Sequence, residues 1–402
     1  MRILYLSSSG QLGGAERVLL DLGAALRRTH PDWSLHLASL EPGPFVAEAG
    51  AAGMITTVLP LSPSLAKLGE AGESPASLAW HLAGAVGPAR RSLKALRRLT
   101  RDVAPTLIHS NGLKTHVLSA MANTPGTPLV WHVHDYLTSR PVTARLLRLL
   151  ARRAQVALAT SESVASDLER AFHGRVPVTA VLNGIDTDDL RPDGPSLDLD
   201  AACGLPPAPP GTVHVGLLAT FARWKGHRVF LDAMSRVPSS VPVRGYVIGG
   251  PLYQTRGAQF DQRELMADVE RLSLAGRVGF TGFKAERAAA LRALDVVVHA
   301  STAPEPFGLV IAEAMSSGRA VITTAQGGAA ELVQPEVDVV TVAPGDAAEL
   351  AQAIVRLAAD PSLRRRLGAV ARETALQRFG RVRFAEDVAS VYASVLRTAL
   401  AA

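Results

Sequence analysis

The sequence has 402 residues, of which 48% are hydrophobic and 19% charged, a composition that excludes an intrinsically disordered chain. This length exceeds what one compact core usually holds and predicts two domains. The single cysteine, Cys203, excludes an internal disulfide, so a cytoplasmic location is the default expectation. The apolar run at 1–6 predicts a strand rather than a leader peptide.

The formal net charge of +6 is unevenly distributed. Residues 1–185 contain 19 Lys and Arg against 12 Asp and Glu, a net of +7, and the remainder contains 23 against 24, a net of −1. The excess lies at 90–101 and 145–153, where leucines and basic residues share helical spacing. We interpret both stretches as solvated helix faces, with peripheral contact to an anionic membrane as the alternative. Nucleic acid is disfavoured, because 90–101 has no aromatic residue on which bases could stack.

Short apolar strands alternate with longer periodic helices along the first half of the chain. A helix is predicted at 15–28, and strands are predicted at 3–7, 34–39, 107–110, 129–134, 156–160 and 178–182. Strands separated by helices of this length imply right-handed crossovers and a parallel sheet. The first half, 1–185, is therefore predicted to be a Rossmann-like domain.

A second doubly wound domain is predicted at 211–377. Between 186 and 210 Asp and Pro dominate without periodicity, which indicates an interdomain linker. Apolar runs that suit buried parallel strands follow at 213–220, 243–248, 278–281, 296–300, 320–324 and 339–342. The last segment, 378–402, predicts an amphipathic helix.

The stretch PEPFGLVIAEAM at 304–315 is the most informative about function. It follows the predicted strand 296–300, at the carboxyl end of a parallel sheet, where open α/β folds bind ligands. Prolines restrict the loop around Glu305, and a helix that begins near Gly308 would offer free N–H groups to a pyrophosphate. Glu313 lies in an otherwise apolar helix, where the hydroxyls of a nucleotide ribose would satisfy its carboxylate. Two solvent-exposed glutamates are the alternative.

Glu305 and Glu313, with seven residues between them, resemble the paired-glutamate signature of the group-one, family 4 glycosyltransferases. The resemblance extends along nearly the whole chain, through GGAE at 13–16, WHVHD at 131–135, NGID at 183–186, KGH at 225–227 and GG at 327–328. It implies a GT-B fold of two Rossmann-like domains, with a C-terminal helix that packs back on the first domain. It also implies retaining transfer of a sugar from a nucleotide-sugar donor to an acceptor hydroxyl, without a metal or other cofactor.

The resemblance places the donor mainly on the second domain. The glycine pair in GGAE is expected beside the donor diphosphate, with a ligand-free turn as the alternative. Glycines at strand ends and the segment 281–283 are expected near the ribose and nucleobase. The expected donor-binding residues are Gly13, Gly14, Thr220, Gly249, Gly250, Gly282, Phe283, Phe307, Gly308, Leu309, Val310 and Glu313.

Lys225 follows the first strand of the second domain, where its charge would stabilise the departing diphosphate. The family commonly has an arginine five residues earlier, where this chain has Thr220, and Arg223 is the candidate replacement. A surface lysine without a role is the alternative. The expected catalytic residues are Glu305, Lys225, His134 and Arg223.

His132 and His134 alternate along a predicted strand and therefore point in the same direction. The resemblance places the histidine before Asp135 beside the transferred sugar, so His134 is preferred there, and Asn111, His132 and Asp135 are expected to bind the acceptor. A structural histidine is the alternative for either ring, and a metal site is rejected because neighbouring strand positions converge poorly. Residues 60–81, rich in Pro, Gly, Ser and Ala, are interpreted either as part of the acceptor site or as a flexible excursion.

The expected chemistry is a front-face displacement, in which a donor phosphate oxygen takes the acceptor's proton and no dedicated base is needed. Two kinds of protein would share this architecture. One is a different enzyme, a nucleotide-sugar epimerase or a phosphorylase. The other is a non-catalytic nucleotide-sugar-binding protein, for which the missing arginine at Thr220 is the support.

Overall fold

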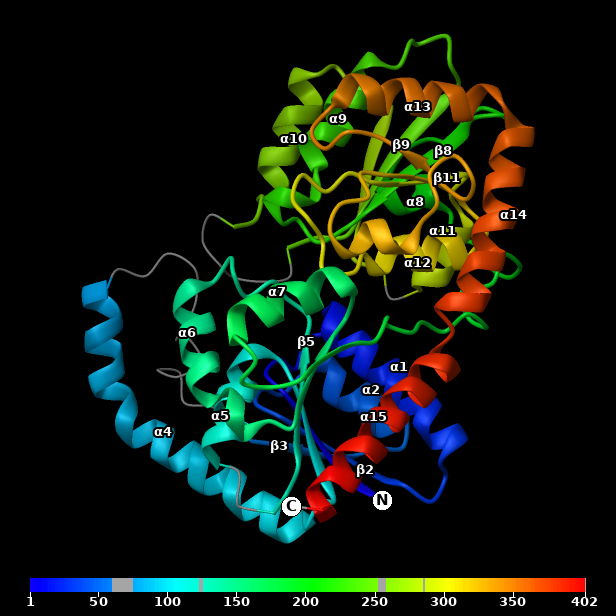
Figure 1. Ribbon diagram of the computed structural model, residues 1–402. Coiled ribbons are helices and arrows are strands. Elements are labelled where there is room, and N and C mark those ends of the chain that lie inside the picture. Colours follow the sequence, from blue (N-terminus) through cyan, green and yellow to red (C-terminus); the bar gives the residue numbers. More distant parts are fainter. Residues whose placement is uncertain (60–74, 123–125, 252–257, 285, 402) are drawn as a thin grey trace. The chain divides into compact units, whose positions relative to one another are not determined.

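The computed structural model describes residues 1–59, 75–122, 126–251, 258–284 and 286–401. The chain forms two compact units (Figure 1). Unit 1 consists of Met1–Gly184 and Arg381–Ala402, and unit 2 of Ile185–Gly380. Both are parallel sheets flanked by helices, as the alternation of apolar strands and periodic helices predicts. No helix among these described residues is both long enough and apolar enough to cross a membrane.

Unit 1 has, within the described residues, a seven-stranded parallel sheet in the order β3-β2-β1-β4-β5-β6-β7. Its strands are β1 (Arg2–Ser7), β2 (Ser34–Ser39), β3 (Ile55–Val58), β4 (Leu107–Asn111), β5 (Leu129–Val133), β6 (Val156–Ala159) and β7 (Val178–Ala180). Its helical segments are α1 (Gly14–Thr29), α2 (Pro44–Ala51), α4 (Pro75–Val103), α5 (Leu113–Ala122), α6 (Pro141–Leu150), η1 (Ala151–Arg153), α7 (Glu162–Phe172) and α15 (Arg381–Ala401). Strands β4, β5 and β6 are buried at every position, because helices cover both of their faces.

Unit 2 has a six-stranded parallel sheet in the order β10-β9-β8-β11-β12-β13, counted over the described part of the chain. Its strands are β8 (Val213–Leu218), β9 (Val243–Ile248), β10 (Val278–Gly282), β11 (Val296–His299), β12 (Ala320–Thr323) and β13 (Val340–Thr341). Its helical segments are α8 (Leu199–Cys203), η2 (Arg223–Lys225), α9 (His227–Arg236), α10 (Gln262–Arg271), α11 (Arg287–Arg292), α12 (Leu309–Ser316), η3 (Gly328–Leu332), α13 (Ala347–Ala359) and α14 (Pro361–Arg378).

Strand order reverses once in each sheet, between β1 and β4 in unit 1 and between β8 and β11 in unit 2. At such a switch point the loops that follow the two strands diverge and leave a crevice at the carboxyl ends. The GGAE run follows β1 and Asn111 is the last residue of β4, whereas Lys225 and Glu305 follow β8 and β11. These four predicted segments thus lie at the switch point of their unit.

The segment 186–210, predicted to be an interdomain linker, is folded. The segment belongs to unit 2 and contains α8, where the carboxylate of Asp200 accepts a 2.6 Å hydrogen bond from Arg244 of β9. The guanidinium of Arg292 donates to the carbonyl oxygen of Asp189 at 3.0 Å. These partners lie 44 and 103 residues away in sequence, so local composition could not reveal them.

Residues 75–81, interpreted from the sequence as part of the acceptor site or as a flexible excursion, begin the helix α4. The rest of the expected excursion, 60–74, lies outside the described residues.

Helix α15 packs on unit 1, as the predicted fold requires. Its apolar face is buried through Phe384, Val388 and Tyr392. The hydroxyl of Tyr392 lies 2.6 Å from Nδ1 of His109 on β4, so the last helix is joined to the centre of the sheet. The register of the amphipathic pattern therefore fixes which face of α15 docks.

His109 is one of four neighbouring histidines in unit 1, with His116, His132 and His134. Burial, with a smaller contribution from the charge of His134, lowers the pKa of His109 to about 3. Burial likewise lowers the pKa of His134 to about 3 and those of His116 and His132 well below the usual value. All four rings are therefore neutral in the folded protein at physiological pH.

Unit 1 should lose stability in mild acid. The rings of His109 and His134 take up protons below pH 6.5 in the unfolded chain but only near pH 3 when folded, so the free energy of unfolding should fall as pH decreases between these values. Going from pH 7 to pH 5 should cost about 2 kcal/mol for each such histidine. Urea unfolding at the two pH values measures this, and equal free energies would contradict it. His109→Gln should reduce the difference, whereas His173→Asn, at an exposed helix end, should not.

Candidate functional site

The loop that carries Lys225 is fixed against the end of β11. Gly226 has φ +78°, and a Cβ there would lie 1.9 Å from the carbonyl oxygen of Ala300, so no other residue fits. The carbonyl of Trp224 accepts a 2.7 Å hydrogen bond from the backbone N–H of Thr302. This close approach brings Lys225 to the loop that contains Glu305.

Glu305 is buried, with 5% of its surface exposed, and its carboxylate is surrounded by donors. Oxygen Oε1 lies 2.6 Å from Nζ of Lys225, 2.7 Å from Nε2 of His299 and 2.5 Å from Oγ of Ser301. Burial raises the pKa of Glu305, but the charges and hydrogen bonds of Lys225 and His299 outweigh it and hold the pKa below its usual range. The glutamate is therefore an ionised group in the interior.

His299 and Ser301 did not emerge from the sequence as site residues. A carboxylate only accepts hydrogen bonds, so Nε2 of His299 must carry the proton that faces Glu305. Its Nδ1 lies 3.0 Å from the hydroxyl of Thr323 on the next strand, β12. The signal was present, because β11 ends in a histidine six residues before the proline-flanked glutamate, but the contact depends on the turn between them.

Helix α12 begins immediately after this cluster. Gly308 precedes it with φ +92°, and no side chain caps the first backbone N–H groups. Leu309 and Val310 in the first turn are partly exposed, whereas Phe307 is buried against Phe379, with ring centroids 6.2 Å apart. The uncapped amino end of a helix attracts an anion through its N–H groups and dipole.

Glu313, one turn into α12, is buried with 2% of its surface exposed. Its carboxylate already has a partner besides the expected ribose, because the guanidinium of Arg287 from α11 forms an ion pair with it. Arg287 is 26 residues earlier in the chain and lies in a helix that had no recognised role. A ligand that binds Glu313 must therefore share it with this arginine.

The carboxyl ends of β8, β9 and β10 lie close together in unit 2. The N–H of Gly249 donates to the carbonyl of Gly282 at 3.1 Å, and a Cβ on Gly249 would lie 2.0 Å from the oxygen of Ala219. The ring of Phe283, 54% exposed, lies beside Gly250. The structure thus brings the predicted residues of β9 and β10 together and leaves one aromatic face open.

Arg223 occupies the same turn as Lys225 but is held by another element. Its guanidinium is 2.9 Å from Glu264 of α10 and lies over the ring of Phe260 at 4.5 Å. Thr220, in the position of the family's arginine, is partly buried at the start of this loop. A phosphate bound by Arg223 would compete with Glu264.

In unit 1, Asn111 joins two of the predicted segments. Its Oδ1 lies 2.7 Å from Nε2 of His134, and its amide nitrogen donates to the carbonyl of Ala15 at 3.1 Å. Asn111 and His132 are each 1% exposed, so the expectation that they contact an acceptor is corrected: Asn111 positions His134, and His132 packs in the core. His134 and Asp135 are each partly exposed as residues.

The GGAE turn begins α1 but shows no steric need for its second glycine. A Cβ on Gly14 would meet nothing within 4 Å, whereas Gly13 is buried in extended conformation. Glu16, which the sequence interpretation passed over, is buried, and this burial raises its pKa to about 7. The accessible backbone at Gly14 leaves room for a ligand to approach.

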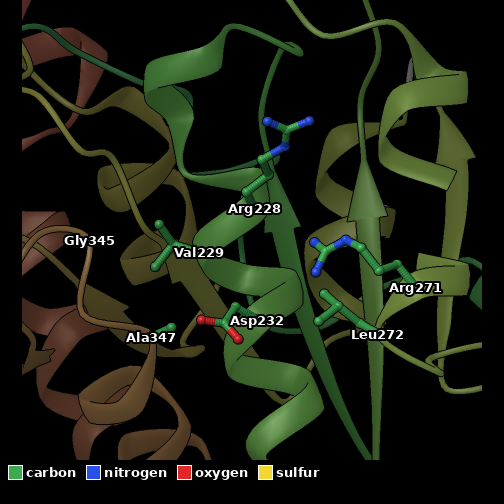
Figure 2. A pocket seen from close by; sticks show the side chains of 7 residues that line it. All are labelled: Arg228, Val229, Asp232, Arg271, Leu272, Gly345 and Ala347. Atoms are coloured by element: carbon green, nitrogen blue, oxygen red, sulfur yellow. The ribbon is translucent and has the colours of Figure 1, made fainter. Parts of the chain in front are cut away.

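Figure 2 shows a pocket elsewhere in unit 2, of about 380 Å³. It lies between the helices α9 and α10 and the start of α13, and none of its lining residues is a predicted site residue. Arg228 and Arg271 on its wall are already paired with Asp268, at 2.8 and 2.9 Å. We therefore place the candidate site at the switch point instead.

Two family models match the chain. Residues 12–189 match the model described as Glycosyltransferase Family 4, and residues 209–360 match the model described as Glycosyl transferases group 1. The lipopolysaccharide core biosynthesis mannosyltransferase LpsB of Rhizobium meliloti is 33% identical over 46% of this chain and 50% of its own length. The N-acetyl-alpha-D-glucosaminyl L-malate synthase of Bacillus anthracis is 25% identical over 65% of each. The chain thus spans about half to two thirds of these curated relatives.

Solved structures match over almost the full chain. Anabaena HepE in complex with UDP-glucose has a TM-score of 0.80 and 27% identity, and covers 98% of this chain and 100% of its own. Sucrose-phosphate synthase from Thermosynechococcus elongatus, at 22% identity, has a TM-score of 0.78 with 99% of both chains covered, and it supports the fold. The chain has the GT-B fold and belongs to the group 1, family 4 glycosyltransferases.

Proposed function

We propose that this protein is a retaining, metal-independent glycosyltransferase whose unit 2 binds a nucleotide-sugar donor. The observation that carries the proposal is the contact between Lys225 and the buried, ionised Glu305, four residues before the uncapped start of α12. A fixed cation and a free helix amino end suit a diphosphate leaving group, whose negative charge grows as the glycosidic bond breaks.

The donor is proposed to bind along the carboxyl ends of the unit 2 strands. The diphosphate contacts Lys225 and the N–H groups at Gly308 and Leu309, and the ribose hydroxyls donate to Glu313. The nucleobase lies against Phe283, the open aromatic face beside β9 and β10. The structure of HepE with UDP-glucose, at 27% identity, supports a uridine nucleotide as the donor.

Unit 1 is proposed to bind the acceptor, with His134 and Asp135 as its accessible polar groups and Asn111 as the residue that orients His134. The relatives named above differ in their acceptors, so the proposal names a hydroxyl-bearing acceptor as a class. His134 is neutral at physiological pH because burial lowers its pKa to about 3, which suits hydrogen bonding to a sugar better than proton transfer.

The reaction is proposed to proceed on one face of the sugar. The bond from the anomeric carbon to phosphate breaks, the acceptor oxygen attacks from the same side, and its proton passes to the departing phosphate. Glu305 keeps Lys225 in place through the step. Catalysis then consists of positioning and charge stabilisation in a prearranged site.

The direct test is a thermal-shift screen with UDP, GDP, ADP and dTDP sugars, followed by transfer to an acceptor panel. The proposal expects stabilisation by UDP sugars and a product with the donor's anomeric configuration, determined by NMR coupling constants. An inverted product would overturn the retaining mechanism. Donor binding without transfer across the panel would favour a non-catalytic binding protein, and epimerised donor would favour an epimerase.

Lys225→Ala should lower kcat by about 100-fold or more, because the leaving diphosphate loses its fixed cation. The matched control is Lys94→Ala on the exposed face of α4 in unit 1, which should leave kcat unchanged. Steady-state transfer with saturating donor measures both. Equal activity of Lys225→Ala and wild type would exclude Lys225 from the phosphate site.

Glu313→Ala should weaken UDP binding by about 10- to 100-fold, the loss expected for hydrogen bonds to a charged group. Glu336→Ala is the control, since it also removes the carboxylate of an ion pair in unit 2, with Arg356, but an exposed one. Isothermal titration with UDP compares them. If Glu313→Ala bound UDP with wild-type affinity, the ribose assignment would be withdrawn.

EDTA treatment should leave the transfer rate within about twofold of the untreated enzyme, since Lys225 and the start of α12 supply the positive charge in this scheme. Activity that disappears with EDTA and returns with Mg²⁺ or Mn²⁺ would contradict it.

A further inference from the structure

Helix α6 in unit 1 presents aliphatic side chains to solvent. Val142, Leu146 and Leu149 are 64, 43 and 70% exposed. They follow one another at intervals of four and three residues, so they lie on one face of the helix. Leu147, on the opposite face, is fully buried against the core. The helix is therefore apolar on its outer side as well as its inner side.

Basic residues border this aliphatic face. Arg145 and Arg148 lie in α6, and Arg152 and Arg153 lie in the adjoining turn η1. The sequence has no acidic residue from 136 to 161. In the part of the chain that the structure describes, none of the four arginines forms an ion pair. Their positive charge is therefore not neutralised by an acidic partner there.

The other basic stretch, on α4, behaves differently. Its charged residues, among them Arg90 and Arg91, are exposed, but Leu96 is buried and Leu93 and Leu99 pack against the core. That pattern is an ordinary solvated helix face, as the sequence interpretation expected for both stretches. Scattered exposed leucines are common on proteins, but a row of them edged by arginines is typical of helices that lie in a membrane interface.

We propose that α6 and η1 form a peripheral docking surface for an anionic phospholipid bilayer. Val142, Leu146 and Leu149 enter the boundary between headgroups and acyl chains, and the arginines pair with lipid phosphates. Pairing of two copies of this face is disfavoured because it would bring the two sets of arginines together. Nucleic acid is disfavoured because α6 and η1 contain no aromatic residue for stacking.

The test is co-sedimentation of the full chain with vesicles of phosphatidylcholine alone or mixed equally with phosphatidylglycerol. Binding is expected to the anionic vesicles, to decrease in high salt, and to be weak on the neutral ones. The double variant V142S/L149S should lower partitioning into anionic vesicles by about tenfold or more. The double variant R145Q/R152Q should lower it by a similar factor.

Two controls separate this surface from general charge and hydrophobicity. R90Q/R91Q removes the same charge from α4, and M266S/L376S removes two side chains, each 50% exposed, from unit 2; both should retain vesicle binding within about twofold. Unchanged thermal midpoints show that the variants fold. Absence of wild-type binding to anionic vesicles, or an equal loss in R90Q/R91Q and R145Q/R152Q, would overturn the proposal. A change of oligomeric state in V142S/L149S would also overturn it, in favour of a protein partner.

Discussion

The site in unit 2 depends on one constraint, the burial of an ionised carboxylate at the switch point. Glu305 can remain charged in the interior only because Lys225, His299 and Ser301 surround it. These three donors lie after β8 and at or after the end of β11. The carboxylate therefore connects the two strands between which the strand order of the sheet reverses. The position of Lys225 is in turn set by Gly226, which lets the backbone approach Ala300. The same short contacts that hold the two strand ends together therefore also position the lysine of the candidate site.

Much of this arrangement could be predicted from the sequence. The buried parallel strands appear as continuous apolar runs, and several motif residues lie at or after the carboxyl ends of the strands that meet at each switch point. Because the carboxyl ends of parallel strands lie at one edge of the sheet, a motif that follows a strand could be assigned to that edge from the sequence. The paired glutamates, the strand-end glycines and the docking face of α15 were accessible in this way.

The rest depended on partners far apart in sequence. Nothing local marks Arg287 as the partner of Glu313, or Arg244 as the residue that fixes Asp200 and turns an apparent linker into part of unit 2. The sequence also does not show how deeply each polar side chain is buried. Asn111 suggests a polar ligand contact from its type and position, yet it is enclosed and orients His134 instead. Composition alone also treated both basic helices alike, whereas exposure separates α4 from α6.

The two segments that make up unit 1 have a practical consequence for dissecting the molecule. A truncation after Gly184 would remove α15 and with it the tyrosine that is hydrogen-bonded to His109, uncovering the face of the sheet that this helix protects. Yet Gly184 and Arg381 are neighbours, since a Cβ on the former would lie 2.8 Å from Cα of the latter. Splicing these positions directly, with the intervening 196 residues expressed as a separate polypeptide, would respect the boundaries of both cores.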